Sequence, residues 1–195
     1  MAEERNPNAI KVLAVAKKYV DEAYKEGENN DTIFGKWFGL NHQPWCAMFV
    51  SYCFDQAGLT KLVAAQGPKG FAACNAGVRW FAKNNQLVAP GQAQPGDIVF
   101  FNFDDDATTA EHVGIVYVNQ PDKQQMVTFE GNTAADNSGS QANGGEAVKK
   151  IRAYKKNNAK KIPAFIVGFG RPKYKTAGGA PATAADKKIC PTCGK

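Results

Sequence analysis

In the first half of the chain, apolar positions recur every three or four residues, which is the period of a helix buried on one face. The first such series is Ile10, Leu13, Ala14, Val20 and Tyr24. Asn6-Pro7 provides an N-cap followed by proline at the first helical position, and Gly27 is a stop signal. Two more helices are predicted from Cys46 to Gly58 and from Cys74 to Asn85, and the Gly- and Asn-rich segment before Cys46 is predicted to be an ordered loop.

The second half of the chain changes to short runs of β-branched and aromatic residues bounded by Gly, Pro or Asn. These runs are PGDIVFF, HVGIVYV, MVTFEG, AVKKIRAY and AFIVGFGRP. A polar, Gly-rich loop separates the third run from the fourth. Helices in one block and strands in the next predict an α+β fold in which N-terminal helices pack on an antiparallel sheet.

The composition changes again after Arg171-Pro172, where Ala, Gly, Pro and Lys dominate and large apolar residues become rare. We therefore expect a folded domain over residues 1–172, a flexible linker over 173–187 and a tail over 188–195. In the tail, Cys190 and Cys193 have the spacing of a zinc knuckle, but a structural zinc site needs four ligands. Zinc would therefore require a second chain, and a local disulfide or an inert terminus are the alternatives.

The overall composition is that of a soluble globular protein, with 44% hydrophobic residues and a net charge of +6. No apolar run is long enough for membrane insertion, and the acidic N-terminus lacks the apolar segment of a signal peptide. The basic segments around residues 149–161 and after Arg171 do not interleave aromatic residues in the way that a stacking surface for bases would, so we do not expect nucleic acid as a partner. Their charge favours an anionic partner, such as an acidic membrane surface or an anionic cell wall, or else a solvated basic surface. The five unevenly spaced cysteines imply no disulfide framework.

Cys46 is the first candidate for chemistry, because it opens a predicted helix directly after a loop. The positive end of the helix dipole and the unpaired N–H groups of the first turn stabilise a thiolate, which is the nucleophilic form of cysteine. They also stabilise the oxyanion of a tetrahedral intermediate. The alternative is a small buried hydrophobic residue, as most free cysteines are. Cys53 and Cys74 are interpreted as packing residues.

A thiolate nucleophile needs a base, and the chain has only two histidines. His112 begins a predicted strand, whereas His42 lies in the loop just before Cys46 and is the poorer candidate. Glu130 and Asn132 close the next strand and project to the same side if that strand is regular, so either of them could orient the imidazole. The alternatives are a surface histidine and a solvated turn at the strand end.

These motifs together resemble a known family. The cysteine in PWCAMFVSYCFDQAGL, the turn and strand QPGDIVFF, the histidine in EHVGIVYV and then FEGN occur in the order found in the CHAP family (cysteine, histidine-dependent amidohydrolase/peptidase). The closing strands with GFGRP are similar to those of phage endolysins that carry this domain. The resemblance covers about residues 5–172.

The resemblance implies a papain-like α+β fold and a lysin that cleaves an amide bond of peptidoglycan, as an N-acetylmuramoyl-L-alanine amidase or an endopeptidase. Cys46 would be the nucleophile, His112 the general base and acid, and Glu130 the orienting group, supported by Asn132. No cofactor is required. The protein would be made in the host cytoplasm without a signal peptide and would act on the cell wall, either released by a holin or carried on the virion. The alternatives are an amidase acting on a small-molecule amide and a virion-associated structural or wall-binding module.

Overall fold

A computed structural model describes residues 6–104, 108–154 and 165–175. Its helices are α1 (Pro7–Asp21), α2 (Ile33–Phe38), α3 (Cys46–Gln56) and α4 (Cys74–Lys83). Its strands are β1 (Leu87–Val88), β2 (Ile98–Asn102), β3 (His112–Gln120), β4 (Gln125–Thr133), β5 (Glu146–Ala153) and β6 (Phe165–Gly170). Short 3-10 turns occur at Glu28–Asn30, Thr60–Val63, Pro90–Gln92 and Pro121–Lys123.

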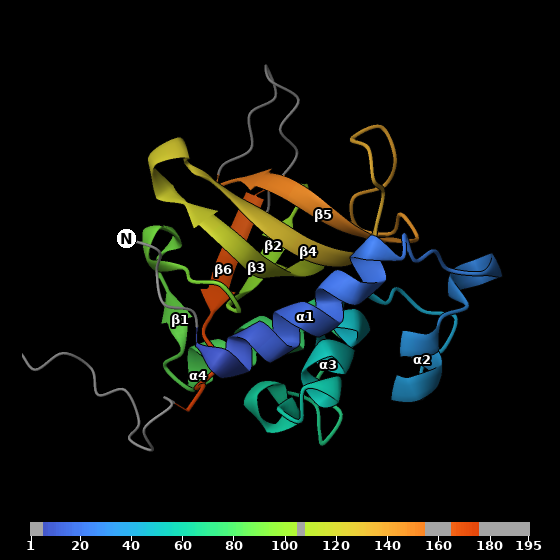
Figure 1. The fold of residues 1–195 in the computed structure, drawn as a ribbon, viewed down its shortest axis with the longest axis horizontal. Helices are drawn as coiled ribbons and strands as arrows, with labels where there is room; N and C mark the ends of the chain where they lie inside the picture. Colours follow the sequence, from blue (N-terminus) through green and yellow to red (C-terminus); the bar gives the residue numbers. More distant parts are fainter. Residues whose placement is uncertain (1–5, 105–107, 155–164, 176–195) are drawn as a thin grey trace, which may run out of the picture.

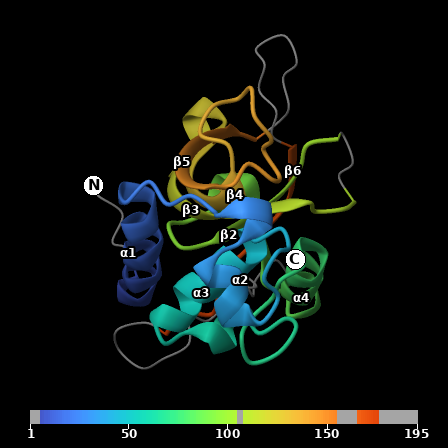
Figure 2. The same cartoon turned by 90° about the vertical axis from the view of Figure 1, so that its right-hand side faces the viewer.

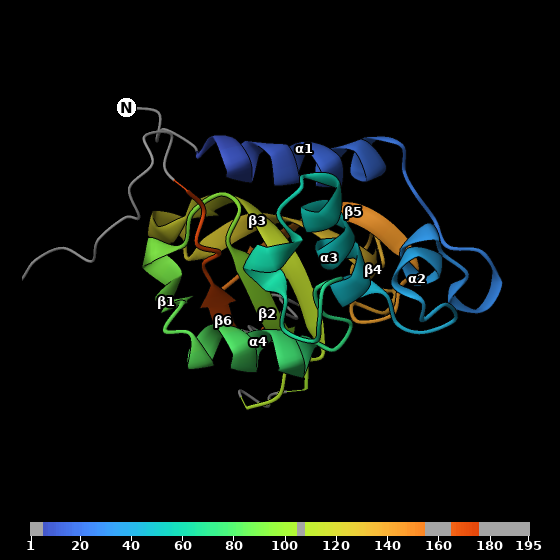
Figure 3. The same cartoon turned by 90° about the horizontal axis from the view of Figure 1, so that it is seen from below.

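Within the described residues, the strands form one antiparallel sheet in the order β1-β6-β2-β3-β4-β5. The helices pack on this sheet, with α1 running across it (Figure 1) and α3 lying between α1 and α4 (Figures 2 and 3). Helix α3 contacts β3 and β4 at the centre of the sheet, while α4 contacts β6. The predicted α+β class, with N-terminal helices on an antiparallel sheet, is confirmed.

The main core lies between α3 and the sheet. Phe49, Val50, Cys53 and Phe54 of α3 are fully buried, and they meet an apolar sheet face that includes Phe100. The opposite face of the sheet has a second apolar cluster, which includes Val99, Phe101, Val116, Met126 and Phe169. Because both faces are covered, β2 is a continuous apolar run rather than an alternating one.

In strand β5, charged side chains are buried and an apolar side chain is exposed, which is the reverse of the usual pattern. Lys150 and Arg152 are buried, whereas Ile151 between them is 67% exposed. The pairing of β5 with β4 sets this orientation, because Met126 lies opposite Arg152 and Thr128 lies opposite Lys150. Since a shift of one residue would turn the other face inward, the register of β5 places two cations inside the protein.

Two elements were not predicted from the sequence, the short helix α2 and the two-residue strand β1. Helix α2 lies in the segment that was expected to be a loop. Its signals are nevertheless present, because the Thr32 hydroxyl accepts from the Gly35 N–H and Gly39 ends the helix in the left-handed conformation, with φ of 94°.

The first helix was predicted to continue to Gly27 but ends at Asp21. The backbone turns at Ala23, with φ of 49°, and then joins the sheet. The Tyr24 carbonyl accepts from the Ala147 N–H, and the Glu26 N–H donates to the Gly145 carbonyl. Hydrogen bonding to the start of β5 therefore replaces the last turns of the helix.

The C-terminal segment packs on the domain as far as the structure describes it. The Tyr174 ring stacks on Phe54 with centroids 6.2 Å apart, and its hydroxyl donates to the Gly96 carbonyl at 2.8 Å. Packing thus extends two residues into the segment predicted as a linker. The rest of that segment and the tail with Cys190 and Cys193 lie outside the described residues. None of the helices within the described ranges has the length and apolar character that a membrane crossing requires.

A close approach of α3 to β4 gives a test of this packing. A Cβ atom on Gly131 would lie 2.6 Å from a ring carbon of Trp45 and 2.7 Å from Phe49. Gly131→Ala is therefore expected to lower the free energy of unfolding by about 1–3 kcal/mol through overpacking, measured by urea denaturation. Gly91→Ala is the control, because a Cβ there meets nothing within 4 Å. Equal stability of the two variants would contradict this packing.

Candidate active site

Cys46 is the first residue of α3, and the residue before it is held firmly in the core. Trp45 is fully buried and stacks on Phe34 with ring centroids 5.1 Å apart. Its indole N–H donates to a Glu26 carboxylate oxygen at 2.5 Å. These contacts fix the start of α3 and therefore the position of the Cys46 sulfur.

The surroundings of Cys46 favour the thiolate. Cys74 Sγ lies 3.6 Å from Cys46 Sγ, and this contact is the largest influence lowering the pKa of Cys46. Burial opposes it, while His112 and the backbone N–H of Ala47 lower the pKa further. The net result is a pKa well below the usual value for a thiol. The location at a helix N-terminus acts in the same direction.

His112 is the first residue of β3 and is fully buried. Its Nε2 lies 2.9 Å from a carboxylate oxygen of Glu130. Its Nδ1 makes no hydrogen bond within the described ranges, although the imidazole and the Cys46 thiolate interact strongly enough to shift each other's pKa. Burial lowers the pKa of His112, but the thiolate and Glu130 outweigh burial and raise it to about 9. The site thus favours a thiolate–imidazolium pair at neutral pH.

Glu130 reaches His112 across β3 because Gly114 leaves room for it. Gly114 is paired with Glu130 in the β3–β4 register and lies two residues from His112, so the three share one face of the sheet. A Cβ atom on Gly114 would lie 2.7 Å from the Cγ of Glu130. The glycine in HVG therefore allows the carboxylate side chain to pass over the neighbouring strand.

The charge of Glu130 is balanced by Arg152 of β5, which is buried with it. Arg152 Nε and Nη2 donate to the two carboxylate oxygens at 2.9 and 2.5 Å, and the Thr128 hydroxyl donates to one of them at 2.5 Å. Burial alone would raise the pKa of Glu130, but Arg152 above all, together with His112, holds it well below its usual range. The guanidinium carbon also lies 5.6 and 5.3 Å from the ring centroids of Phe101 and Phe103.

The remaining predicted site residue, Asn132, is buried but makes no hydrogen bond with His112 in the described part of the chain. Its backbone has φ of 60°, and the β4–β5 register shifts between Glu130 and Thr133. Its side chain instead donates to Asn143 Oδ1 at 3.0 Å and accepts from the Gly145 N–H at 3.4 Å. The strand does not keep the regular alternation on which the prediction depended, and Asn132 anchors the loop between β4 and β5.

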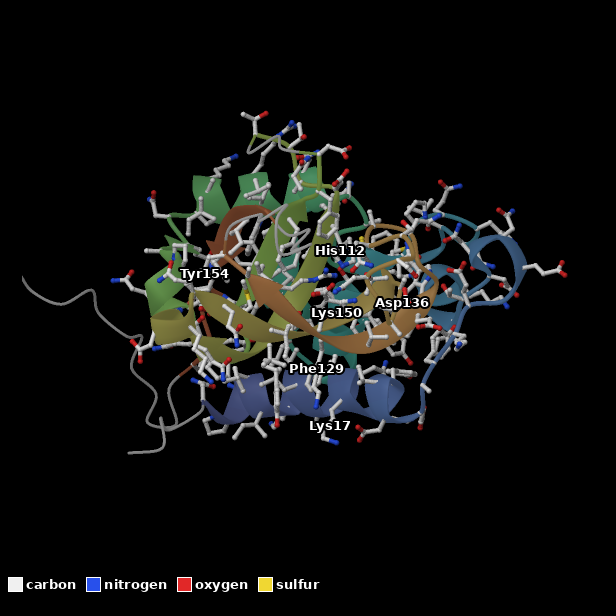
Figure 4. The ribbon with its side chains drawn as sticks, turned by 90° about the horizontal axis from the view of Figure 1, so that it is seen from above. Lys17, His112, Phe129, Asp136, Lys150 and Tyr154 are labelled. Atoms are coloured by element: carbon white, nitrogen blue, oxygen red, sulfur yellow. The ribbon has the colours of Figure 1, made fainter. Side chains whose placement is uncertain are left out.

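That loop, residues 134–145, is tied to the site by two buried side chains of β5. Lys150 Nζ donates to the carbonyls of Ala134, Ala135 and Asp136 at 3.0–3.2 Å, and Figure 4 shows Lys150 directed toward Asp136. Gln141 Oε1 accepts from Arg152 Nη1 at 2.8 Å. The guanidinium that binds Glu130 therefore also binds the loop.

The other cysteines and the second histidine have distinct environments. Cys53 is fully buried in α3, and burial raises its pKa well above the usual value. Cys74 is the first residue of α4 and lies beside Cys46, which its sequence context did not indicate. His42 is exposed, and its ring nitrogen contacts the Asn29 carbonyl at 2.9 Å.

Within the described part of the chain, no three side chains of the His, Cys, Asp and Glu types are grouped to hold a metal ion. The predicted zinc ligands Cys190 and Cys193 lie outside it. Cys46, His112 and Glu130 bring together a thiol, an imidazole and a carboxylate, which is the combination of groups used in nucleophilic catalysis by cysteine.

The part of the chain that holds these groups is similar to a known protein family. Residues 38–132 match the family model described as "CHAP domain". Over these residues, the chain corresponds to a CHAP domain. The matched region of the CHAP domain contains Cys46, Cys74, His112 and Glu130, but ends before Gln141 and Arg152.

Two curated relatives are similar to part of the chain. A "Probable endopeptidase p60" of Listeria seeligeri is 32% identical over 108 residues, which are 55% of this chain and 16% of the relative. The protein of the same name from Listeria grayi is 30% identical over 104 residues, or 53% of this chain and 15% of the relative. The chain thus spans about a sixth of the length of these relatives. A crystal structure of an NlpC/P60 family protein from Bacillus cereus aligns with a TM-score of 0.46 at 15% identity, covering 86% of this chain and 41% of that one.

The lowered pKa of Cys46 predicts unusual thiol reactivity. At about pH 6, an ordinary thiol with a pKa of about 8.5 is almost entirely protonated, whereas Cys46 is expected to react readily with iodoacetamide. The rate constant for alkylation of Cys46, followed by mass spectrometry against pH, checks this. His112→Ala should move the profile to higher pH, because the imidazolium that stabilises the thiolate is lost. A wild-type profile equal to that of a free thiol would contradict the ion pair.

The buried Arg152–Glu130 pair predicts a large loss of stability when the cation is removed. Arg152→Met leaves a buried carboxylate without its main partner, so the free energy of unfolding should fall by about 3–5 kcal/mol in urea denaturation. Arg152→Lys should lose less, because one charge-assisted contact remains. Arg79→Met, at an exposed arginine of α4, is the matched control. The pair would be shown to be unimportant if Arg152→Met were no less stable than Arg79→Met.

Proposed function

We propose that this chain is a peptidoglycan hydrolase that cleaves an amide bond of the bacterial cell wall, with Cys46 as the nucleophile. The observation that carries the proposal is the buried series Cys46, His112 and Glu130, in which thiolate, imidazolium and carboxylate are the favoured forms. The CHAP domain and the relatives named as probable endopeptidases support an amidase or endopeptidase acting through a cysteine.

The first half of the proposed reaction forms an acyl-enzyme. The Cys46 thiolate attacks the carbonyl carbon of the scissile amide, and N–H groups at the start of α3 donate to the oxyanion. His112 then gives its Nδ1 proton to the leaving nitrogen, the C–N bond breaks, and the amine departs. Glu130 holds Nε2 throughout and stabilises the charged ring.

The second half releases the product. His112, now neutral, accepts a proton at Nδ1 from a water molecule that attacks the thioester carbonyl. The C–S bond breaks, which restores the Cys46 thiolate and frees a carboxylic acid. Because His112 must carry a proton in the first half, hydrolysis should fall as the pH rises past the pKa of about 9.

The setting of the proposed activity is the cell wall, where the basic part of the chain favours contact with anionic polymers. The resemblance to phage lysins supports release by a holin or carriage on a virion. The alternatives of a small-molecule amidase and of a wall-binding module without activity predict different outcomes in the experiment below.

The test is digestion of purified Gram-positive and actinobacterial peptidoglycan. The wild-type protein should lower the turbidity and release fragments whose masses and new termini identify the bond cut. Cys46→Ala and His112→Ala should lower the rate by about a thousandfold or more, while His42→Asn, at the exposed histidine, should retain activity. Full clearing by Cys46→Ala would disprove the proposal. Wall binding without any fragment release by the wild-type protein would favour the binding module.

A further inference from the structure

Two cysteines that are 28 residues apart in the sequence meet beside the proposed nucleophile. Cys46 is the first residue of α3 and Cys74 is the first residue of α4, and their sulfur atoms lie 3.6 Å apart. Neither of them forms a disulfide. They lie at the margin of the core, with exposed fractions of 3% and 7%, whereas Cys53 is completely enclosed at 0%.

The two thiols differ in character. Cys46 is the thiolate, whereas the neighbouring negative charge and burial keep Cys74 protonated and raise its pKa well above the usual value. The Cys46 sulfur therefore reacts first with an electrophile, while Cys74 remains a protonated thiol in contact with it. A low-pKa thiolate beside a second cysteine is the arrangement found at cysteines that undergo reversible oxidation.

We propose that Cys74 is a resolving cysteine that converts oxidised Cys46 into a reversible Cys46–Cys74 disulfide. The oxidant is a hydroperoxide. The Cys46 thiolate attacks one peroxide oxygen, the O–O bond breaks, and Cys46 becomes a sulfenic acid as the peroxide is reduced and leaves as hydroxide or alkoxide, which takes up a proton. The Cys74 sulfur then attacks the Cys46 sulfur, the S–O bond breaks, and water leaves with the proton of Cys74.

The geometry suits this second step. A disulfide needs an S–S distance of about 2.05 Å, so the two sulfur atoms must approach by about 1.5 Å. Each cysteine is the first residue of its helix, where the backbone N–H has no partner inside the helix, so a small shift of this residue breaks no such bond. The disulfide removes the thiolate and so inactivates the site, and a dithiol restores both thiols.

The contact also has a protective consequence. A sulfenic acid without a neighbouring thiol is oxidised further to a sulfinic acid, which ordinary thiols do not reduce. Capture by Cys74 stops the oxidation at a recoverable stage. The proposal concerns the two sulfur atoms and does not depend on which amide bond the site cleaves.

The experiment treats the full chain with hydrogen peroxide near neutral pH, blocks the remaining thiols, and maps disulfides by mass spectrometry of proteolytic peptides. Mapping is needed because the chain has further cysteines, including Cys190 and Cys193 outside the described residues. A variant with both of these changed to serine serves as a background control. The expected product is a peptide cross-linked between Cys46 and Cys74. Cys46 should lose its labelling by iodoacetamide and regain it after dithiothreitol.

Cys74→Ser is the matched variant, because its hydroxyl keeps a hydrogen-bond donor near Cys46 but forms no disulfide. In this variant, peroxide should abolish the labelling of Cys46 by iodoacetamide, measured against the untreated variant, and dithiothreitol should not restore it. The mass of the Cys46 peptide should increase by two oxygen atoms. Cys74→Ala provides a second comparison if the serine variant is unstable. The proposal is overturned if the wild-type protein forms no Cys46–Cys74 peptide, or if it recovers no better than Cys74→Ser. Because this experiment measures thiol labelling, its result does not depend on whether the protein hydrolyses peptidoglycan. Failure of the disulfide proposal and failure of the proposed function can therefore be told apart.

Discussion

The site depends on the contact between Arg152 and Glu130. A carboxylate that is fully withdrawn from water would ordinarily take up a proton, and a neutral Glu130 would not favour a charged imidazole. The bidentate guanidinium keeps it ionised. Arg152, Glu130, His112 and Cys46 then form a line of alternating charges whose sum is zero. Each charge stabilises the next, so the thiolate at one end is supported by a cation that does not contact it.

This line of charges is possible because two glycines allow neighbouring elements to pack closely around it. Gly114 leaves the space through which the Glu130 side chain crosses β3. Gly131 allows Trp45 and Phe49 to pack directly against β4, and Trp45 fixes the start of α3. The register of β5 supplies the cation by turning Arg152 inward and leaving Ile151 exposed. Apolar packing and the placement of the charged groups are therefore consequences of the same strand register.

The sequence allowed prediction of features that local signals encode. Cys46 stands at a helix start, His112 at a strand start and Glu130 near a strand end, and each lies where the pattern placed it. The roles of Arg152, Gln141 and Cys74 depend on strand register and on the meeting of two helix ends, which no local pattern encodes. Asn132 was expected to support Glu130 beside the imidazole. It has a left-handed backbone next to a register shift, and its side chain hydrogen-bonds to the loop. Helix α2 could have been predicted, because Thr32 and Gly39 are local signals for the start and the end of a helix.

Through Gln141, the loop between β4 and β5 binds the same Arg152 side chain that binds the Glu130 carboxylate. An enzyme engineer who replaces this loop to alter its length or chemistry thus removes an acceptor from a buried cation. A transplanted loop needs an amide or carbonyl oxygen at the position of Gln141, whatever the rest of its sequence. A change to this loop can therefore alter the ionisation of Glu130, and through it the charge states of His112 and Cys46.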